Sequence, residues 1–240
     1  MKERIAIVNG FRTPFCKMGS TFSSITADQL AVYPLVEAFL RSNVAPEEID
    51  EVITGCCAQP AHAANISRVI ALRAGVPNHV PALTVHRNCA SGMEALTSGV
   101  QRLLLGDADI IAAVGVESMS NIPLLYNKSM TQFFAKLMKA KTLYQRLKVL
   151  SSFRFSHLKP VIALQLGLTD PICNLLMGNT AENLSREFKI TRDHQDEFAL
   201  QSHLKALNAQ ENGYFNDEII PVQLPNKYNE TIVSDNGPRK

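Results

Sequence analysis

Residues 81–96, PALTVHRNCASGMEAL, contain the transition that decides the fold. Ala82 to Val85 is a short apolar run typical of a strand, and Ala90 to Leu105 has the pattern of a helix that ends at Gly106. The strand therefore passes into the helix through a sharp turn, and the helix begins at or just after Cys89. The residues that follow Cys89 are small, so a bound molecule could approach its sulfur closely.

The same alternation of strand and helix extends on both sides of this turn. Pro34 should start or kink the first helix, and the last strand is an unbroken apolar run, as expected of a strand buried on both faces. Strands that alternate with helices predict βαβ units and a mostly parallel sheet. The further strands predicted are Ile5–Val8, Glu51–Thr54 and Ile110–Val116, and the further helices Asp28–Ser42 and Ile66–Arg73.

The pattern changes after Ser120. Apolar residues recur at helical spacing from Met130 to Leu150, among lysines and arginines, and no Asp or Glu occurs from residue 121 to 169. We therefore divide the chain into an α/β domain, residues 1–120, and a largely helical domain, residues 121–240. The second domain should also contain helices at Thr180–Phe188 and Thr191–Asn212 and an apolar segment at Asp217–Leu224.

Composition limits the class of protein. The 240 residues are 46% apolar and 19% charged, which excludes a disordered chain. No apolar run reaches the length of a membrane-spanning helix, and the first residues resemble neither a signal nor a transit peptide. Five cysteines without a C-x-x-C pair argue against a disulfide framework or a zinc site, so we expect no metal and a reducing cytosol. The net charge of +2 is uninformative, and we expect no nucleic-acid partner.

Cys89 is the candidate nucleophile. The free N–H groups and the dipole of a helix start favour a thiolate, and the same N–H groups could stabilise an oxyanion. The other interpretation, a small buried cysteine, stays open on geometry alone. Cys56 and Cys57 follow a strand, where neighbours point to opposite faces, so at most one of them could line a site. We interpret all four of the other cysteines as structural: Cys16, Cys56, Cys57 and Cys173.

The segment Asn88-Cys89-Ala-Ser-Gly92, with Glu94-Ala95, resembles the nucleophile motif of the thiolase family. The resemblance covers nearly the whole chain and implies a thiolase-like α/β fold. The implied fold has a βαβ layered domain with a mixed, mostly parallel sheet, and a helical loop domain. The C-terminal half of the family fold is absent from it. The other motifs that are similar, in the family's order, are Arg12–Phe15, Gly115–Ser120, Met177–Asn183, Thr191–Ala199 with Ser202-His203, Asp217–Val222 and Asp235–Arg239.

The resemblance implies an acyltransferase that cleaves 3-ketoacyl-CoA with CoA, giving acetyl-CoA and a shortened acyl-CoA in fatty-acid β-oxidation. Cys89 matches the nucleophile that becomes an acyl-thioester. CoA and acyl-CoA are the implied substrates, with no covalently bound cofactor. Arg239 matches an arginine near the adenine and 3′-phosphate of CoA, and Met177 and Leu168 match apolar positions near the pantetheine arm.

Two chemical groups of the family are missing from these residues. The histidine that activates the nucleophile belongs to a G-H-P segment and the second cysteine to a C-x-G-G-G segment, and neither occurs here. His86 lies three residues before Cys89, but at the end of a strand we interpret it as structural. The other histidines, His62, His79, His157, His194 and His203, also lie outside the family's catalytic motif.

These departures leave other functions open. The chain could be a catalytically incomplete CoA-binding or assembly module, inactive alone. It could also be a related condensing enzyme, such as a ketoacyl synthase or hydroxymethylglutaryl-CoA synthase, although Met177–Asn183 and Thr191–Ala199 count against this.

The acyl-chain length follows from two further segments. Leu176 stands where short-chain acetoacetyl-CoA thiolases commonly carry a histidine, and residues 139–155 resemble the thiolase subunit of trifunctional β-oxidation complexes. Both favour longer acyl chains and degradation, with a short-chain acetyl-CoA acetyltransferase as the alternative.

The resemblance also implies partners: a second copy in a homodimer or tetramer, and a hydratase/dehydrogenase subunit. Residues 130–150 could dock on that subunit or on an anionic membrane, which would make a cytoplasmic protein peripheral at the membrane. They could also attract polyanionic CoA esters, or form an ordinary surface helix packed on its own domain.

Overall fold

The computed structural model describes residues 4–225 and 227–239. They form two compact units, one from residues 4–121 with the described part of 192–240, and the other from Ile122–Thr191. The sequence-based division was residues 1–120 and 121–240, whereas here the described residues from 192 to 239 group with the first unit. Arg12 accounts for this, because its Nε lies 2.8 Å from Glu218 Oε1 and its Nη1 lies 2.8 Å from Asp235 Oδ1.

A three-stranded parallel sheet is the centre of the first unit, in the order β2–β1–β3. The strands are β1, Glu51–Gly55, β2, Ala82–Val85, and β3, Ile111–Gly115. Gly55 pairs in register with Val85 on one side and with Gly115 on the other. All three strands therefore end at one edge of the sheet, and the segments that follow them leave from that edge.

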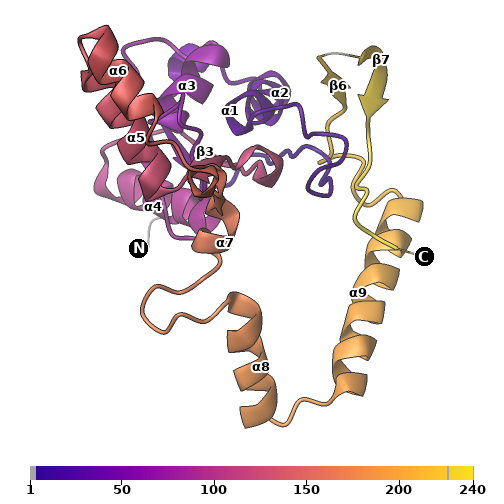
Figure 1. The fold of residues 1–240 in the computed structure, drawn as a ribbon. Coiled ribbons are helices and arrows are strands. Elements are labelled where there is room, and N and C mark those ends of the chain that lie inside the picture. The colour runs from indigo at the N-terminus through magenta and orange to yellow at the C-terminus, as the bar shows by residue number, and fades with distance from the viewer. Residues whose placement is uncertain (1–3, 226, 240) are drawn as a thin grey trace. The chain divides into compact units, whose positions relative to one another are not determined.

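Helices cover both faces of this sheet (Figure 1). The helices α1, Ala27–Leu30, α2, Val32–Ser42, and α3, Ile66–Arg73, build the main apolar core with Val52 and Cys56 of the β1 segment. Helix α4, Ser91–Leu105, packs on the other face of the sheet. The side chains of a strand alternate between its faces, so β1 meets α2 and α3 with one set of residues and α4 with the other.

A buried charge joins α1 to α3. The Asp28 side chain is fully buried, and its Oδ1 lies 3.0 Å from His62 Nε2 while its other oxygen pairs with Arg73. A carboxylate without such partners would be costly to bury. These contacts therefore hold the first helix against the helix that precedes β2.

Most predicted elements of the first unit are confirmed. Strands β1 and β2 and helix α3 lie where the pattern places them, and α4 begins at Ser91. The helix predicted at 28–42 is broken at Ala31, and Pro34 lies in the first turn of α2, where a missing N–H costs no helical hydrogen bond.

Two predictions for this unit are wrong. Ile5–Val8 forms no strand, and Ile7 is 80% exposed. Strand β3 is not buried on both faces, because Val114 is its only buried residue. The two errors share a reason: β3 is an edge strand, and no further strand among the described residues pairs with it. An apolar run indicates that a segment can form a strand, but the burial of that strand also requires a neighbouring strand or helix to cover it.

The rest of the first unit is a helix and a hairpin. Helix α9, Arg192–Glu211, contains no buried residue, and β6, Val222–Leu224, pairs antiparallel with β7, Lys227–Ile232. Val222 and Leu224 pack with Phe22 and Ile25 in a small second core. Short 3₁₀ turns lie at η1, Pro46–Glu48, and η2, Met119–Asn121.

The second unit is a helical segment with a short two-stranded sheet. Strands β4, Leu124–Tyr126, and β5, Pro160–Ile162, pair antiparallel. The helices are α5, Lys128–Lys139, α6, Leu143–Leu150, α7, Ala163–Gly167, and α8, Met177–Glu187, with a 3₁₀ turn η3, Phe155–Leu158. Phe133 is buried and its ring packs edge-on against Phe153, with the centroids 5.5 Å apart.

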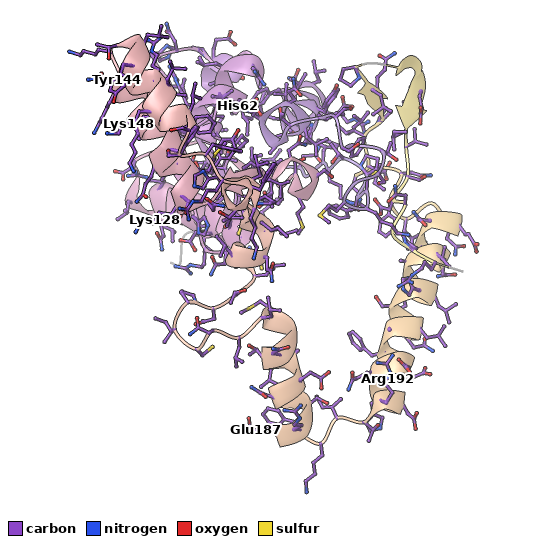
Figure 2. All side chains as sticks on the ribbon, in the orientation of Figure 1. His62, Lys128, Tyr144, Lys148, Glu187 and Arg192 are labelled. Atoms are coloured by element: carbon purple, nitrogen blue, oxygen red, sulfur yellow. The ribbon has the colours of Figure 1, made fainter. Side chains whose placement is uncertain are left out.

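The predicted amphipathic stretch of residues 130–150 is two helices, α5 and α6, which we call the basic helix pair. Helix α5 ends before Ala140, and Thr142 begins α6 by accepting a hydrogen bond from the Gln145 N–H at 3.2 Å. The Gln145 side chain accepts one from the Thr142 N–H in return, at 3.3 Å. Lys128, Tyr144 and Lys148 project from the pair (Figure 2). Within the described residues, no helix combines the length and apolar character of a membrane span.

Gly55 is the position where the packing of α4 on the sheet can be tested. A Cβ at Gly55 would lie 2.0 Å from the Ser91 carbonyl oxygen, so Gly55→Ala must push α4 away from β1. We expect a loss of about 1–3 kcal/mol in the free energy of unfolding, measured by urea denaturation. Gly10→Ala is the control, because open space surrounds that position. Equal stability of the two variants would contradict this packing.

Candidate active site

Cys89 lies in the turn that joins β2 to α4. The Ala90 N–H donates to the Arg87 carbonyl oxygen and the Ser91 N–H to the Asn88 carbonyl oxygen, both at 3.0 Å. The buried Ser91 hydroxyl donates to the Asn88 carbonyl at 2.6 Å and accepts from the Arg87 N–H at 2.9 Å. Asn88 has a left-handed backbone, with φ of 46°, which asparagine tolerates well. The Cys89 side chain is exposed on this fixed turn.

Three glycines allow the turn to sit directly on the sheet. Gly55 and Gly115 end two paired strands, and Gly92 lies in the first turn of α4. A Cβ at Gly55 would collide with the Ser91 backbone, and one at Gly115 would lie 3.1 Å from the Gly92 Cα. The first turn of α4 therefore rests on the backbone of the strand ends, which fixes the position of Cys89 before it.

The start of α4 offers hydrogen-bond donors beside this thiol. Within the part of the chain that the structure describes, the N–H groups of Gly92 and Met93 make no hydrogen bond. Arg87 pairs with Glu94 at 3.0 Å and closes the turn from outside. Unused N–H groups at a helix start suit an anionic group, so the site can hold developing negative charge close to an exposed sulfur.

A carboxylate occupies the same edge of the sheet. Glu117 follows β3, and its oxygens accept hydrogen bonds from the Cys57 N–H at 2.9 Å and from the Ala58 N–H at 3.1 Å. Burial raises the pKa of the Cys57 thiol, and the charges of Glu117 and Cys89 raise it further. Burial also raises the pKa of Cys56 to about 12, with added contributions from Glu117 and Cys57.

The two adjacent cysteines therefore differ. Cys56 is part of the apolar core, whereas Cys57 is half-buried and lies within electrostatic reach of Cys89. The sequence indicated that at most one of them could line a site, but we interpreted both as structural. Glu117 was not singled out at all. The sequence signal for Cys57 and Glu117 was their position after predicted strands, since residues that directly follow neighbouring parallel strands gather at one edge of the sheet.

The histidine nearest in sequence has a structural contact. His86 Nδ1 accepts a long hydrogen bond from the Asn88 N–H, at 3.5 Å. No hydrogen bond to the Cys89 sulfur is present in residues 4–225 and 227–239. These contacts support the interpretation of His86 as part of the turn.

The predicted CoA contacts lie in different units. Leu168 and Met177 are brought together in the second unit, where the Met177 N–H donates to the Leu168 carbonyl at 3.0 Å, and both side chains are partly exposed. Arg239 belongs to the first unit, with Cys89, and its backbone N–H donates to His203 Nδ1 at 3.1 Å. Its own side chain is exposed.

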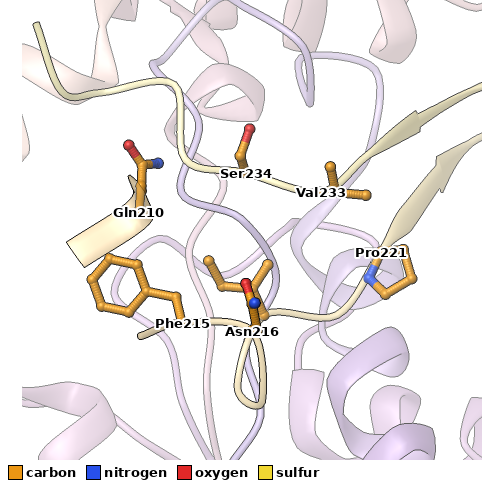
Figure 3. Close-up of a pocket in the computed structure, with 7 residues that line it drawn as sticks. Gln210, Phe215, Asn216, Pro221, Val233 and Ser234 are labelled. Atoms are coloured by element: carbon orange, nitrogen blue, oxygen red, sulfur yellow. The ribbon is translucent and has the colours of Figure 1, made fainter. Parts of the chain in front are cut away.

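A separate pocket of about 260 Å³ lies in the first unit. Figure 3 shows side chains from the end of α9 and from the chain around the β6–β7 hairpin that line it, among them Phe215 and Val233. All of the lining residues fall between 210 and 234, so the pocket does not include the Cys89 turn.

Comparison with known proteins identifies the family. The family model described as "Thiolase, N-terminal domain" matches residues 5–240. The chain belongs to the thiolase family. Its Cys89 turn, with Asn88 before the cysteine and Gly92 on the sheet, is the segment that first indicated this membership.

Individual thiolases agree with this assignment. The mitochondrial trifunctional enzyme subunit beta of Homo sapiens is 35% identical over 237 residues, 99% of this chain and 49% of that subunit. A 3-ketoacyl-CoA thiolase of Photorhabdus laumondii is 36% identical over 238 residues, 99% of this chain and 54% of that enzyme. Human mitochondrial 3-ketoacyl-CoA thiolase, solved in complex with CoA, has a TM-score of 0.79 at 30% identity and covers 95% of this chain and 53% of its own.

The chain spans about half the length of the curated relatives it matches. The thiolase-like α/β fold predicted from the motifs is confirmed, with its parallel sheet and covering helices.

The electrostatic link between Glu117 and Cys57 can be measured. Because the Glu117 charge raises the Cys57 pKa, Glu117→Gln should lower that pKa and increase the thiolate fraction at neutral pH. We expect a modest rise in iodoacetamide labelling of Cys57, since burial is the larger cause and remains. Peptide mapping by mass spectrometry across pH 6–9 gives the rate.

Two internal references make this test specific. Glu47→Gln removes an exposed carboxylate elsewhere and should change nothing, and Cys173, in the other unit, should label equally in all variants. Slower or unchanged labelling of Cys57 in Glu117→Gln would contradict the link.

Proposed function

We propose that this chain carries the acyl-accepting nucleophile of a 3-ketoacyl-CoA thiolase that acts in fatty-acid β-oxidation. The observation that carries the proposal is the exposed Cys89 thiol, held on a fixed turn beside the unused N–H groups of α4. Names of relatives support the reaction class, since they include 3-ketoacyl-CoA thiolases and a trifunctional enzyme subunit.

The proposed reaction has two halves. The Cys89 thiolate attacks the 3-keto carbonyl, the bond between C2 and C3 breaks, and acetyl-CoA leaves as its carbanion, which takes up a proton. The sulfur then holds the shortened acyl group as a thioester, and the thiol of a second CoA attacks it. Sulfur suits both halves because it is a good nucleophile and a good leaving group. The N–H groups of Gly92 and Met93 could donate hydrogen bonds to the carbonyl oxygen as negative charge forms on it.

Three further residues would hold CoA in this proposal. The Arg239 guanidinium makes no ion pair with any described carboxylate, so it is available for a phosphate of the cofactor. Leu168 and Met177 present adjacent, partly exposed apolar side chains, which suit the pantetheine arm.

The alternative is a CoA-binding or assembly module. This alternative is favoured by one observation: among the described residues, no histidine is hydrogen-bonded to the Cys89 sulfur. A nucleophile that no base activates reacts slowly. We therefore expect the 240 residues alone to react with substrate slowly, because the family's activating histidine and its second cysteine belong to segments that do not occur among them.

Acyl-enzyme formation tests the proposed nucleophile. The chain is incubated with 3-ketopalmitoyl-CoA, quenched in acid, and mapped for thioesters by mass spectrometry. We expect the acyl group on the peptide that contains Cys89, and none in Cys89→Ala. Cys173→Ala is the matched control, because Cys173 is also exposed and should be dispensable.

The outcomes separate the two functions. An adduct that survives in Cys89→Ala would overturn the assignment of the nucleophile. No adduct, together with slower iodoacetamide labelling of Cys89 when CoA is present, would favour the binding module.

Substrate length, partners and compartment belong to the same proposal. Similarity to a trifunctional enzyme subunit supports longer acyl chains and a hydratase/dehydrogenase partner, with a short-chain acetyl-CoA acetyltransferase as the alternative. We also propose a homodimer or tetramer, as the family resemblance implies, and a cytoplasmic protein, on the odd number of cysteines.

The basic helix pair is the proposed docking surface for a membrane or partner. Its inner side is buried at Met130 and Phe133, but Met138 is 87% exposed and Tyr144 is 76% exposed. Exposed apolar side chains among lysines, without a carboxylate, are typical of a surface that meets anionic lipid.

Flotation with anionic vesicles tests this docking. Lys139, Lys141 and Lys148 changed together to Glu should lower vesicle binding, because each basic residue contributes about 1 kcal/mol near such a surface. Loss of all three corresponds to a roughly hundredfold fall in partition. The control changes Lys17, Lys189 and Lys205 to Glu, an equal change of charge elsewhere. Equal flotation of the two variants would remove the lysines from the proposal.

A further inference from the structure

Cys57 is a thiol at the candidate site that the proposed thiolase reaction does not use. It lies two residues beyond Gly55, the last residue of β1, and Cys89 lies four residues beyond Val85, the last residue of β2. Gly55 and Val85 are partners in the register, and the Cys56 N–H continues the pairing by donating to the Val85 carbonyl at 3.3 Å. The two segments therefore leave the sheet side by side.

The alternation of β1 directs Cys57 toward the Cys89 turn. Gly55 faces the start of α4, since its Cβ position falls 2.0 Å from the Ser91 carbonyl oxygen. Cys56 points the other way and is 1% exposed in the core beneath α2 and α3. Cys57 lies beyond the end of β1, but the N–H alternation continues through it, since the Cys56 N–H donates to Val85 on the β2 side and the Cys57 N–H to Glu117 on the β3 side. This alternation returns Cys57 to the face of Gly55, where Cys89 precedes Ser91 by two residues.

The backbone and the charges fit this placement. Glu117 fixes the position of Cys57 by accepting hydrogen bonds from the Cys57 and Ala58 N–H groups. The two sulfurs are close enough for the Cys89 charge to raise the Cys57 pKa. A disulfide needs about 4.4–6.8 Å between Cα atoms, and this is the separation that the proposed bond requires of the two segments.

We propose that Cys57 and Cys89 form a redox pair, in which a hydroperoxide oxidises Cys89 and Cys57 closes a disulfide with it. The Cys89 thiolate attacks a peroxide oxygen, the O–O bond breaks, and the other oxygen leaves as water or an alcohol after taking a proton. Cys89 is then a sulfenic acid. The Cys57 sulfur attacks the Cys89 sulfur, the S–O bond breaks, and the hydroxyl leaves as water with the Cys57 proton.

The order of the two steps follows from the environments of the thiols. Cys89 is exposed and meets the peroxide first, whereas Cys57 is half-buried and held as a neutral thiol. The two thiols together give two electrons to the peroxide, and a small dithiol restores them by exchange. The disulfide occupies the candidate nucleophile, so it stops acyl transfer reversibly and prevents oxidation of Cys89 to sulfinic acid. It requires only the two thiols and does not depend on the proposed acyl transfer.

Peptide mapping without reduction tests the pair. The chain is treated with hydrogen peroxide, free thiols are blocked with N-ethylmaleimide, and trypsin releases Cys57 in residues 42–68 and Cys89 in residues 88–102. We expect these two peptides to be linked, and dithiothreitol to separate them. Because Cys56 shares the first peptide, the Cys56→Ala variant must keep the link and the Cys57→Ser variant must lose it.

A second measurement guards against a folding artefact. In Cys57→Ser, dimedone should trap a persistent sulfenic acid on Cys89, and the sulfinic form should accumulate several-fold faster than in the parent chain. Cys16→Ser, a change at another half-buried cysteine, should behave like the parent. The proposal is overturned if Cys89 links to another cysteine, if the link survives in Cys57→Ser, or if peroxide carries Cys89 to sulfinic acid equally fast with and without Cys57.

Discussion

The contact between Gly55 and the backbone of Ser91 is the constraint on which the candidate site depends. A helix can approach a strand this closely only where no Cβ stands between them, and here the separation leaves no room for one. Since β1 is hydrogen-bonded to both neighbouring strands, the first turn of α4 is held against the central strand of the sheet. Cys89, two residues earlier, takes its position from that contact and from the hydrogen bonds of Ser91.

The edge of the sheet gathers groups that are far apart in the sequence. Cys57, Cys89 and Glu117 come from the ends of three different strands, and no local motif connects them. Their arrangement gives each thiol a separate character: Cys56 is sealed in the core, Cys57 is held neutral by burial and by a carboxylate, and Cys89 is open to solvent. The chemistry of the site is therefore a property of the sheet and not of the cysteine motif alone.

Sequence patterns predicted the local structure better than its surroundings. The strand, turn and helix around Cys89 were predicted because apolar spacing and Gly106 are local signals. The strand predicted at Ile5–Val8 failed because pairing needs a partner that a short apolar run does not specify. The break in the basic helix pair was missed, although the Thr142–Gln145 capping pair is visible in the sequence. The position of Glu117 after a strand placed it at the edge of the sheet, but its hydrogen bonds were not predictable, because its partners are backbone N–H groups about 60 residues away.

The ion pairs of Arg12 have a consequence for folding during synthesis on the ribosome. Arg12 and Asp235 are separated by 223 residues, and translation adds about 5–20 residues per second. The guanidinium therefore waits roughly 10–45 s for its carboxylate, long after the central sheet has been synthesised. The sheet can fold during this interval while the N-terminal segment stays unanchored. The segment around Arg12 is thus fixed late, and the second unit, Ile122–Thr191, is synthesised before the first is complete.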